Sequence, residues 1–106
     1  MEFVKAFIDR EGFEAEVREA ERELQAEGRV IHIRYDLDYD STGDPAVHFR
    51  VVVPDESMKS EKLLNTINYV SAVIEQKLQP HLWGVFPYFR YWSKTTQETI
   101  REPAWA

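Results

Sequence analysis

The sequence contains no cysteine among its 106 residues and no long apolar run. Without cysteine there is no disulfide and no thiolate chemistry, so a zinc site would need histidine and carboxylate ligands alone. A membrane-spanning helix needs roughly 18 consecutive apolar residues, and no segment of the sequence provides them. The first residues, MEFVKAFIDRE, carry too many charges for the apolar region of a secretory leader. We therefore expect a soluble, cytoplasmic protein.

Glycine is scarce as well, and its four copies stand alone at positions 12, 28, 43 and 84. A loop that cradles phosphate groups needs clustered glycines, so the sequence has no nucleotide-binding loop of that kind. The serines lie in no nucleophile-elbow motif, and no HExxH sequence is present. We expect no catalytic residues, no cofactor and no bound metal. A metal-dependent or small-molecule-binding enzyme is the least favoured interpretation.

Acidic residues outnumber basic ones, which gives a formal net charge of −6. Residues 1–56 hold fifteen acids and seven bases, whereas residues 57–106 hold four acids and six bases. Nucleic-acid binding driven by overall charge is therefore disfavoured, although the sequence is compatible with a local basic surface. The hydrophobic fraction of 43%, with 13% aromatic residues, is typical of a globular protein. We expect one α+β domain over residues 1–106, with a C-terminal tail from about residue 95.

The clearest pattern runs from residue 29 to residue 53, where apolar side chains occupy every second position of two segments. Because side chains alternate across a strand, each segment has one apolar and one polar face, which predicts the two strands of a hairpin. The apolar positions are Ile31, Ile33, Tyr35, Leu37 and Tyr39 in the first segment and Val47, Phe49, Val51 and Val53 in the second.

The turn between these strands decides which residues face each other. A three-residue loop, Ser41-Thr42-Gly43, pairs Asp40 with Asp44. It puts its glycine at the left-handed position that follows a type I turn, where glycine has no steric cost. A loop two residues longer would pair Asp36 with Arg50, which is the better electrostatic match. Turn chemistry favours the shorter loop.

Two helices are predicted from apolar residues three and four positions apart. The first covers most of residues 2–27, with Gly12 as a weak point and a stop at Gly28, and the second covers about 58–79. A third strand follows over residues 85–92, where Pro87 is typical of an edge strand or a strand start. Thr95 and Glu98 have the spacing of a capping box for one last helical turn.

These elements predict an α+β fold with the order helix, strand, strand, helix, strand. A three-stranded sheet, made of the hairpin and the third strand, would have both helices packed on one face, because that arrangement buries every apolar stripe at once. The second helix would be a crossover, so the third strand should run parallel to the second. We expect it beside the first strand, which would then be central.

The aspartate-rich segment 36–44 is a candidate calcium loop. An EF-hand needs glycine at its sixth position and glutamate at its twelfth, but counting from Asp36 these positions hold Ser41 and Val47. The three histidines, His32, His48 and His81, form no compact ligand set in the sequence. Neither group predicts a metal site.

The second face of the sheet is the candidate binding surface. It should show the polar residues of the hairpin and one side of the third strand, either Phe86, Tyr88, Arg90 and Trp92 or Val85, Phe89 and Tyr91. Either set leaves aromatic residues beside arginines, a combination typical of a binding surface. The alternative is that the C-terminal tail, with Trp105, folds back and covers this face. The candidate binding residues are Arg34, Asp36, His48, Arg50, Tyr88, Arg90 and Trp92.

Two functions fit such a face. The first is a protein–protein interaction module with a regulatory or accessory role, acting as a homodimer or on a larger partner. The second is single-stranded RNA binding, with aromatic rings stacking on bases and arginines on phosphates. The element order, and the segment VHFRVVVPDES followed by a long helix and a third strand, resemble the type II KH arrangement of ribosome-binding factor A over residues 46–92. That resemblance implies RNA or ribosome association, but the chain lacks a GxxG clamp and is acidic, so RNA binding ranks second.

Overall fold

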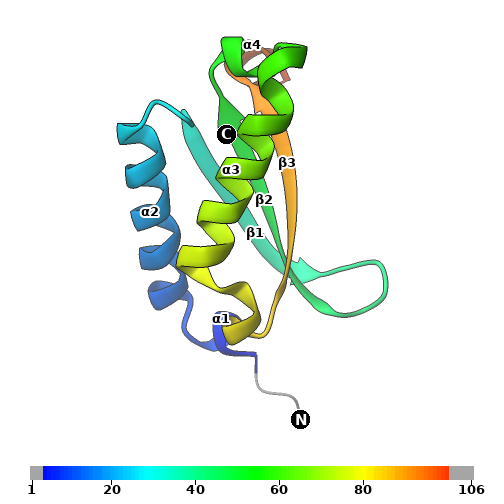
Figure 1. Cartoon of the computed structure of the whole chain (residues 1–106). Coiled ribbons are helices and arrows are strands. Elements are labelled where there is room, and N and C mark those ends of the chain that lie inside the picture. Colours follow the sequence, from blue (N-terminus) through cyan, green and yellow to red (C-terminus); the bar gives the residue numbers. More distant parts are fainter. Residues whose placement is uncertain (1–3, 101–106) are drawn as a thin grey trace.

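The computed structural model describes residues 4–100 and has an α+β architecture (Figure 1). Helices α2 and α3 lie side by side over one face of a three-stranded sheet, which confirms the predicted fold class and element order. The elements are α1 (Lys5–Ile8), α2 (Arg10–Ala26), β1 (His32–Tyr39), β2 (Pro45–Val53), the 3-10 turn η1 (Asp55–Met58), α3 (Ser60–Leu78), the 3-10 turn η2 (Pro80–Trp83), β3 (Phe86–Ser93) and α4 (Lys94–Ile100).

The β1–β2 hairpin has the predicted three-residue loop. The N–H of Asp40 donates to the carbonyl of Asp44 at 2.8 Å, and Gly43 adopts a φ of +86°. The register therefore sets Tyr35 opposite Phe49 and leaves Asp36 opposite His48 rather than Arg50. The alternative of a longer loop that pairs Asp36 with Arg50 is wrong, because the backbone geometry of the turn outweighs the gain from one ion pair.

The central strand is β2, and the prediction that β1 is central is wrong. As predicted, β3 runs parallel to β2, but it pairs with β2 itself, which gives the order β1-β2-β3. The physical reason lies in the composition of β2, because Val51, Val52 and Val53 are consecutive and all buried. A continuous apolar run is typical of a strand covered on both faces, whereas β1 keeps exposed polar residues such as Asp36 on one side.

The helix boundaries differ from prediction at two positions. The break between α1 and α2 falls at Asp9 instead of Gly12, because the Asp9 side chain caps α2 by accepting the N–H of Gly12 at 2.9 Å. Helix α4 begins one residue before the predicted cap at Thr95, and the Oγ of Ser93 accepts the N–H of Thr96 at 3.0 Å. The stop at Gly28 is confirmed by its φ of +71°. Trp105 lies outside the described residues.

The core fills the space between the two helices and the sheet. Most odd-numbered strand residues belong to it. Tyr91 of β3 contacts α3, where its hydroxyl shares a hydrogen bond with the hydroxyl of Ser71. Burial raises the pKa of Tyr91 to about 12. The buried positions include Phe13, Val17 and Leu24 of α2, Val70, Ile74 and Leu78 of α3, and Ile33, Phe49 and Val51 of the sheet.

Helix α2 also closes the outer edge of β1. The buried carboxylate of Glu21 accepts the N–H of Ile33 at 2.7 Å, and an Nη of Arg18 donates to the carbonyl of the same residue at 2.9 Å. Farther along, the amide of Gln25 donates to the carbonyl of Ile31 at 2.7 Å. These side chains occupy backbone groups of β1 that would otherwise be available to another strand.

Candidate functional site

The sheet face turned away from α2 and α3 carries the even-numbered residues of all three strands. The strand register aligns them in four rows across the sheet: His32, Val52 and Trp92; Arg34, Arg50 and Arg90; Asp36, His48 and Tyr88; and Asp38, Ala46 and Phe86. All seven candidate residues lie on this face, and the first of the two alternatives for β3 is the one that the structure adopts. Their role in binding stays a prediction.

The end of this face nearest α4 is closed. Arg50 is only 3% exposed, so the expectation that it is accessible is wrong. The ring of the half-buried Trp92 lies over it, with the guanidinium carbon 3.8 Å from the ring centroid in a cation–π contact. Helix α4 contacts β2 and β3 here, and the neighbouring Val52 is also buried. Arg50 therefore stabilises the fold and is poorly placed to touch a ligand, whereas Trp92, which covers it, remains partly exposed.

The opposite end of the face, near the hairpin turn, is open. Phe86 is 60% exposed and Tyr88 is 40% exposed. Their ring centroids lie 5.1 Å apart, and the ring of Tyr88 stacks on that of His48 at 5.2 Å with an interplanar angle of 11°. These three residues form a continuous surface, which we call the aromatic patch. Phe86 and Tyr88 therefore expose aromatic surface near the charged residues Asp36, Asp38, Arg34 and Arg90 of the same face.

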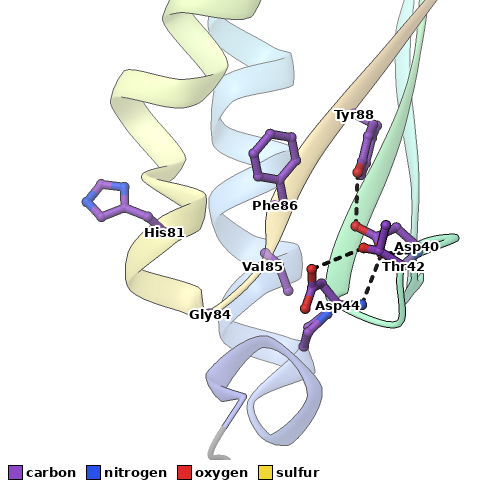
Figure 2. Close-up of a pocket in the computed structure, with 9 residues that line it drawn as sticks. Asp40, Thr42, Asp44, His81, Gly84, Val85, Phe86 and Tyr88 are labelled. Carbon is purple, nitrogen blue, oxygen red and sulfur yellow. Dashed lines mark hydrogen bonds between the residues drawn. The ribbon is translucent and has the colours of Figure 1, made fainter.

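The hairpin turn holds the aromatic patch in position. Figure 2 shows the Tyr88 hydroxyl turned toward Asp40, to which it donates a hydrogen bond of 2.9 Å. The other carboxylate oxygen of Asp40 accepts the hydroxyl of Thr42 at 2.6 Å and the N–H of Asp44 at 3.0 Å. These hydrogen bonds, that of Thr42 foremost, lower the pKa of Asp40 to about 2. Asp40 is thus charged at neutral pH, and Tyr88 is anchored at both its ring and its hydroxyl.

Two hollows flank Phe86, and sequence reasoning missed both. One of about 450 Å³ lies between the hairpin turn and the start of β3, with Asp40, Asp44 and Tyr88 in its wall. The other, of about 790 Å³, lies between the end of α3 and the start of β3. Phe86 belongs to both walls, together with His81 and Val85, and Figure 2 shows the residues that line the first hollow. The alternation of residues in the third strand placed Phe86 in one of two possible outward-facing sets. No local pattern indicated that the hairpin turn would lie beside it.

Within residues 4–100, no group of three or more histidine and acidic side chains is arranged to hold a metal ion. The carboxylates of Asp40 and Asp44 both accept hydrogen bonds from Thr42 instead. None of the described helices combines the length and apolarity that crossing a membrane requires.

Comparisons of the chain with protein-family models, with curated proteins and with solved structures found no match.

Proposed function

We propose that this chain is a non-enzymatic interaction module that binds another protein through the aromatic patch. The observation that carries the proposal is the exposure of Phe86 and Tyr88 on a rigid sheet. Aromatic anchors supply much of the binding energy of protein interfaces. Because Asp40 and His48 already hold the Tyr88 ring, little side-chain freedom would be lost on binding.

The charges around the patch suggest what the partner presents. The patch is bordered by acidic residues: Asp36 lies in the same row as His48 and Tyr88, and Asp38, Asp40 and Asp44 lie toward the turn. On the side of α4 it is bordered by the exposed Arg34 and Arg90. A complementary partner would place an apolar group on Phe86 and Tyr88, basic groups toward the turn and acidic groups toward the arginines. Such a partner is a second copy of this chain or a larger cytoplasmic protein that the module regulates or assists.

Single-stranded RNA binding is the second candidate. The row of Arg34, Arg50 and Arg90 beside Tyr88 favours it, because RNA platforms combine stacking rings with cations. The burial of Arg50 and the acidic turn weaken this candidate, since phosphates would meet only two accessible arginines and several carboxylates. It therefore ranks below protein binding.

The proposal predicts that the double variant Phe86→Ala/Tyr88→Ala folds normally but loses its partner. Both side chains are exposed, so the thermal midpoint should change by only a few degrees. In a mild-salt pulldown of the tagged protein from its host, partner recovery should fall by about tenfold or more, as expected when interface anchors are removed. The matched control is Leu64→Ala, which removes a large apolar side chain that is 66% exposed on α3.

The pulldown separates the candidates. A stoichiometric protein recovered with the wild type and with Leu64→Ala, but not with the double variant, supports the proposed function. Equal recovery with all three contradicts it. RNA that is recovered with the wild type and falls away steeply as salt is raised would instead favour the second candidate.

A further inference from the structure

Strand β3 forms one edge of the sheet (Figure 1), and the backbone groups on its outer side face away from β2. Pro87 has no N–H, so it is tolerated in a strand only where its nitrogen points away from the neighbouring strand. Because successive residues alternate, Phe89 and Tyr91 also direct their N–H and C=O groups outward. The hairpin supports this assignment. Because the N–H of Asp40 donates to the carbonyl of Asp44, the even-numbered residues of β2 direct their backbone N–H and C=O groups toward β1. The odd-numbered residues of β2 therefore direct theirs toward β3. In a parallel pair, a residue hydrogen-bonds to the two neighbours of the residue opposite it. The odd residues of β2 therefore bond to even residues of β3, such as Tyr88 and Arg90, which leaves the odd residues of β3 facing outward.

This edge differs from that of β1. Within residues 4–100, the backbone N–H and C=O groups of Phe89 and Tyr91 make no hydrogen bond beyond the sheet, whereas Ile33 of β1 is occupied by Glu21 and Arg18 of α2. An edge with unpaired groups is a template for an added strand, and natural proteins normally protect such edges. Pro87 protects only the beginning of this one.

We propose that β3 pairs antiparallel with β3 of a second copy of the chain, around a two-fold axis at Phe89. The two three-stranded sheets would then form one continuous six-stranded sheet. A two-fold dimer requires a self-complementary surface, and two identical antiparallel edges meet that condition. The inference rests on the proposed function in one respect, since it names a second copy of this chain as a protein that it binds.

The side chains of β3 select this register. With the axis at Phe89, each Tyr88 faces Arg90 of the second copy, and each Phe86 faces Trp92. The first pair brings an aromatic ring to a cation and the second joins two aromatic rings, and both pairings are favourable. An axis at Arg90 would instead oppose two arginines, which is unfavourable.

The backbone agrees with the same register. Phe89 would exchange two hydrogen bonds with Phe89 of the second copy, and the N–H of each Tyr91 would reach the carbonyl of Pro87. An axis at Tyr88 would instead oppose each Phe89 to Pro87, which has no N–H, so neither central pair could exchange two hydrogen bonds. The hollow between the end of α3 and the start of β3 leaves room beside Pro87, and the small side chain of Ala72 contributes to its wall.

Cysteine variants test the register directly, because the chain has no cysteine of its own. Tyr88→Cys and Arg90→Cys are prepared separately, then oxidised alone and as an equal mixture. Directly opposed residues of a pair without mutual hydrogen bonds have Cα atoms about 4.5 Å apart, which suits a disulfide, whereas diagonal residues are about 7–8 Å apart. We expect about tenfold more covalent dimer in the mixture than in either variant alone. Asp36→Cys, on the same face at the other edge of the sheet, should not cross-link with either.

The unmodified protein provides a second measurement. Sedimentation should give twice the 12.5 kDa mass of the chain at high concentration, and hydrogen exchange of the Phe89 and Tyr91 amides should slow as concentration rises. A monomer at millimolar concentration, or equal cross-linking in the mixture and in the single variants, would overturn the proposal. Loss of a host protein from the Phe86→Ala/Tyr88→Ala variant, with amide exchange independent of concentration in the wild type, would keep the proposed function and reject the dimer.

Discussion

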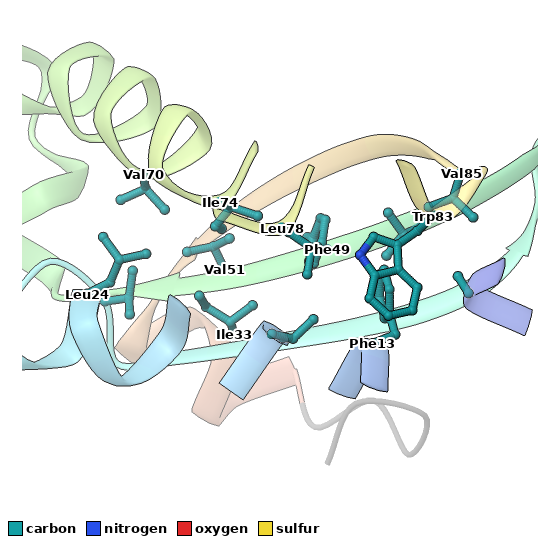
Figure 3. Packing of buried hydrophobic residues seen from close by; sticks show 14 of the residues in the cluster. Phe13, Leu24, Ile33, Phe49, Val51, Val70, Ile74, Leu78, Trp83 and Val85 are labelled. Carbon is teal, nitrogen blue, oxygen red and sulfur yellow. The ribbon is translucent and has the colours of Figure 1, made fainter. Parts of the chain in front are cut away.

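Replacing Phe49 by alanine is expected to lower the free energy of unfolding by about 3–5 kcal/mol, the range for removing a buried phenylalanine. Phe49 is fully buried on the central strand. Its ring stacks on Phe89 with centroids 5.2 Å apart and lies 6.4 Å from the ring of Tyr35. Figure 3 shows it on the helix side of β2, close to Leu78 of α3. The substitution would therefore leave a cavity where both helices and all three strands meet.

A domain of this size has a total stability of about 5–15 kcal/mol, so the Phe49→Ala variant should be partly unfolded at 37 °C or close to it. Chemical and thermal unfolding followed by circular dichroism measures the change. The control is His48→Ala, at the next position on the other face of β2, where the expected cost is below about 1 kcal/mol. Equal losses for the two variants would contradict the assignment of the two sheet faces.

Replacing Glu21 by alanine is expected to lower the free energy of unfolding by about 1–3 kcal/mol, because the buried N–H of Ile33 would lose its acceptor. The Glu21 carboxylate accepts the N–H of Ile33, and its second oxygen pairs with Arg18 at 2.7 Å. Arg18 would keep its ion pair with Glu14, also at 2.7 Å, so the loss should come mainly from the orphaned backbone group. The thermal midpoint should fall by roughly 4–8 °C per kcal/mol.

Two variants on the same helix complete this experiment. Glu21→Gln keeps an acceptor for the N–H of Ile33 and should recover part of the lost stability. Glu19→Ala removes an exposed carboxylate two residues away and should change the free energy of unfolding by less than about 0.5 kcal/mol. If Glu21→Ala is as mild as Glu19→Ala, the helix does not protect the edge of β1 in the way described.

The hairpin and the two sheet faces could be predicted from sequence because local rules determine them. Alternation defined the faces of β1 and β2, and the preference of Gly43 for a left-handed conformation selected the loop. The face of β3 could not be chosen in this way, since Phe86 and Tyr88 are as aromatic as Phe89 and Tyr91. Tertiary contacts decide it, because the Tyr91 hydroxyl reaches Ser71 of α3 and Phe89 stacks on Phe49.

The missed features depend on residues far apart in the chain. Arg50 is buried because Trp92, 42 positions later, covers it, and no local pattern signals that contact. The consecutive valines 51–53 favour a central position for β2 and could have indicated the strand order. The crossover helix alone is compatible with β3 lying beside either β1 or β2. The hollows beside Phe86 arise where the turn, β3 and the end of α3 meet, so they emerge only from the assembled fold.

The most direct test of the proposed binding face is hydroxyl-radical labelling of the side chains, read by mass spectrometry in host lysate and in buffer. Labelling of Phe86 and Tyr88, measured relative to the exposed Leu64 and Tyr39, should drop several-fold in lysate, as expected for anchors buried in an interface. Unchanged relative labelling of Phe86 and Tyr88 would show that nothing in the host covers the aromatic patch, and it would contradict the proposed function.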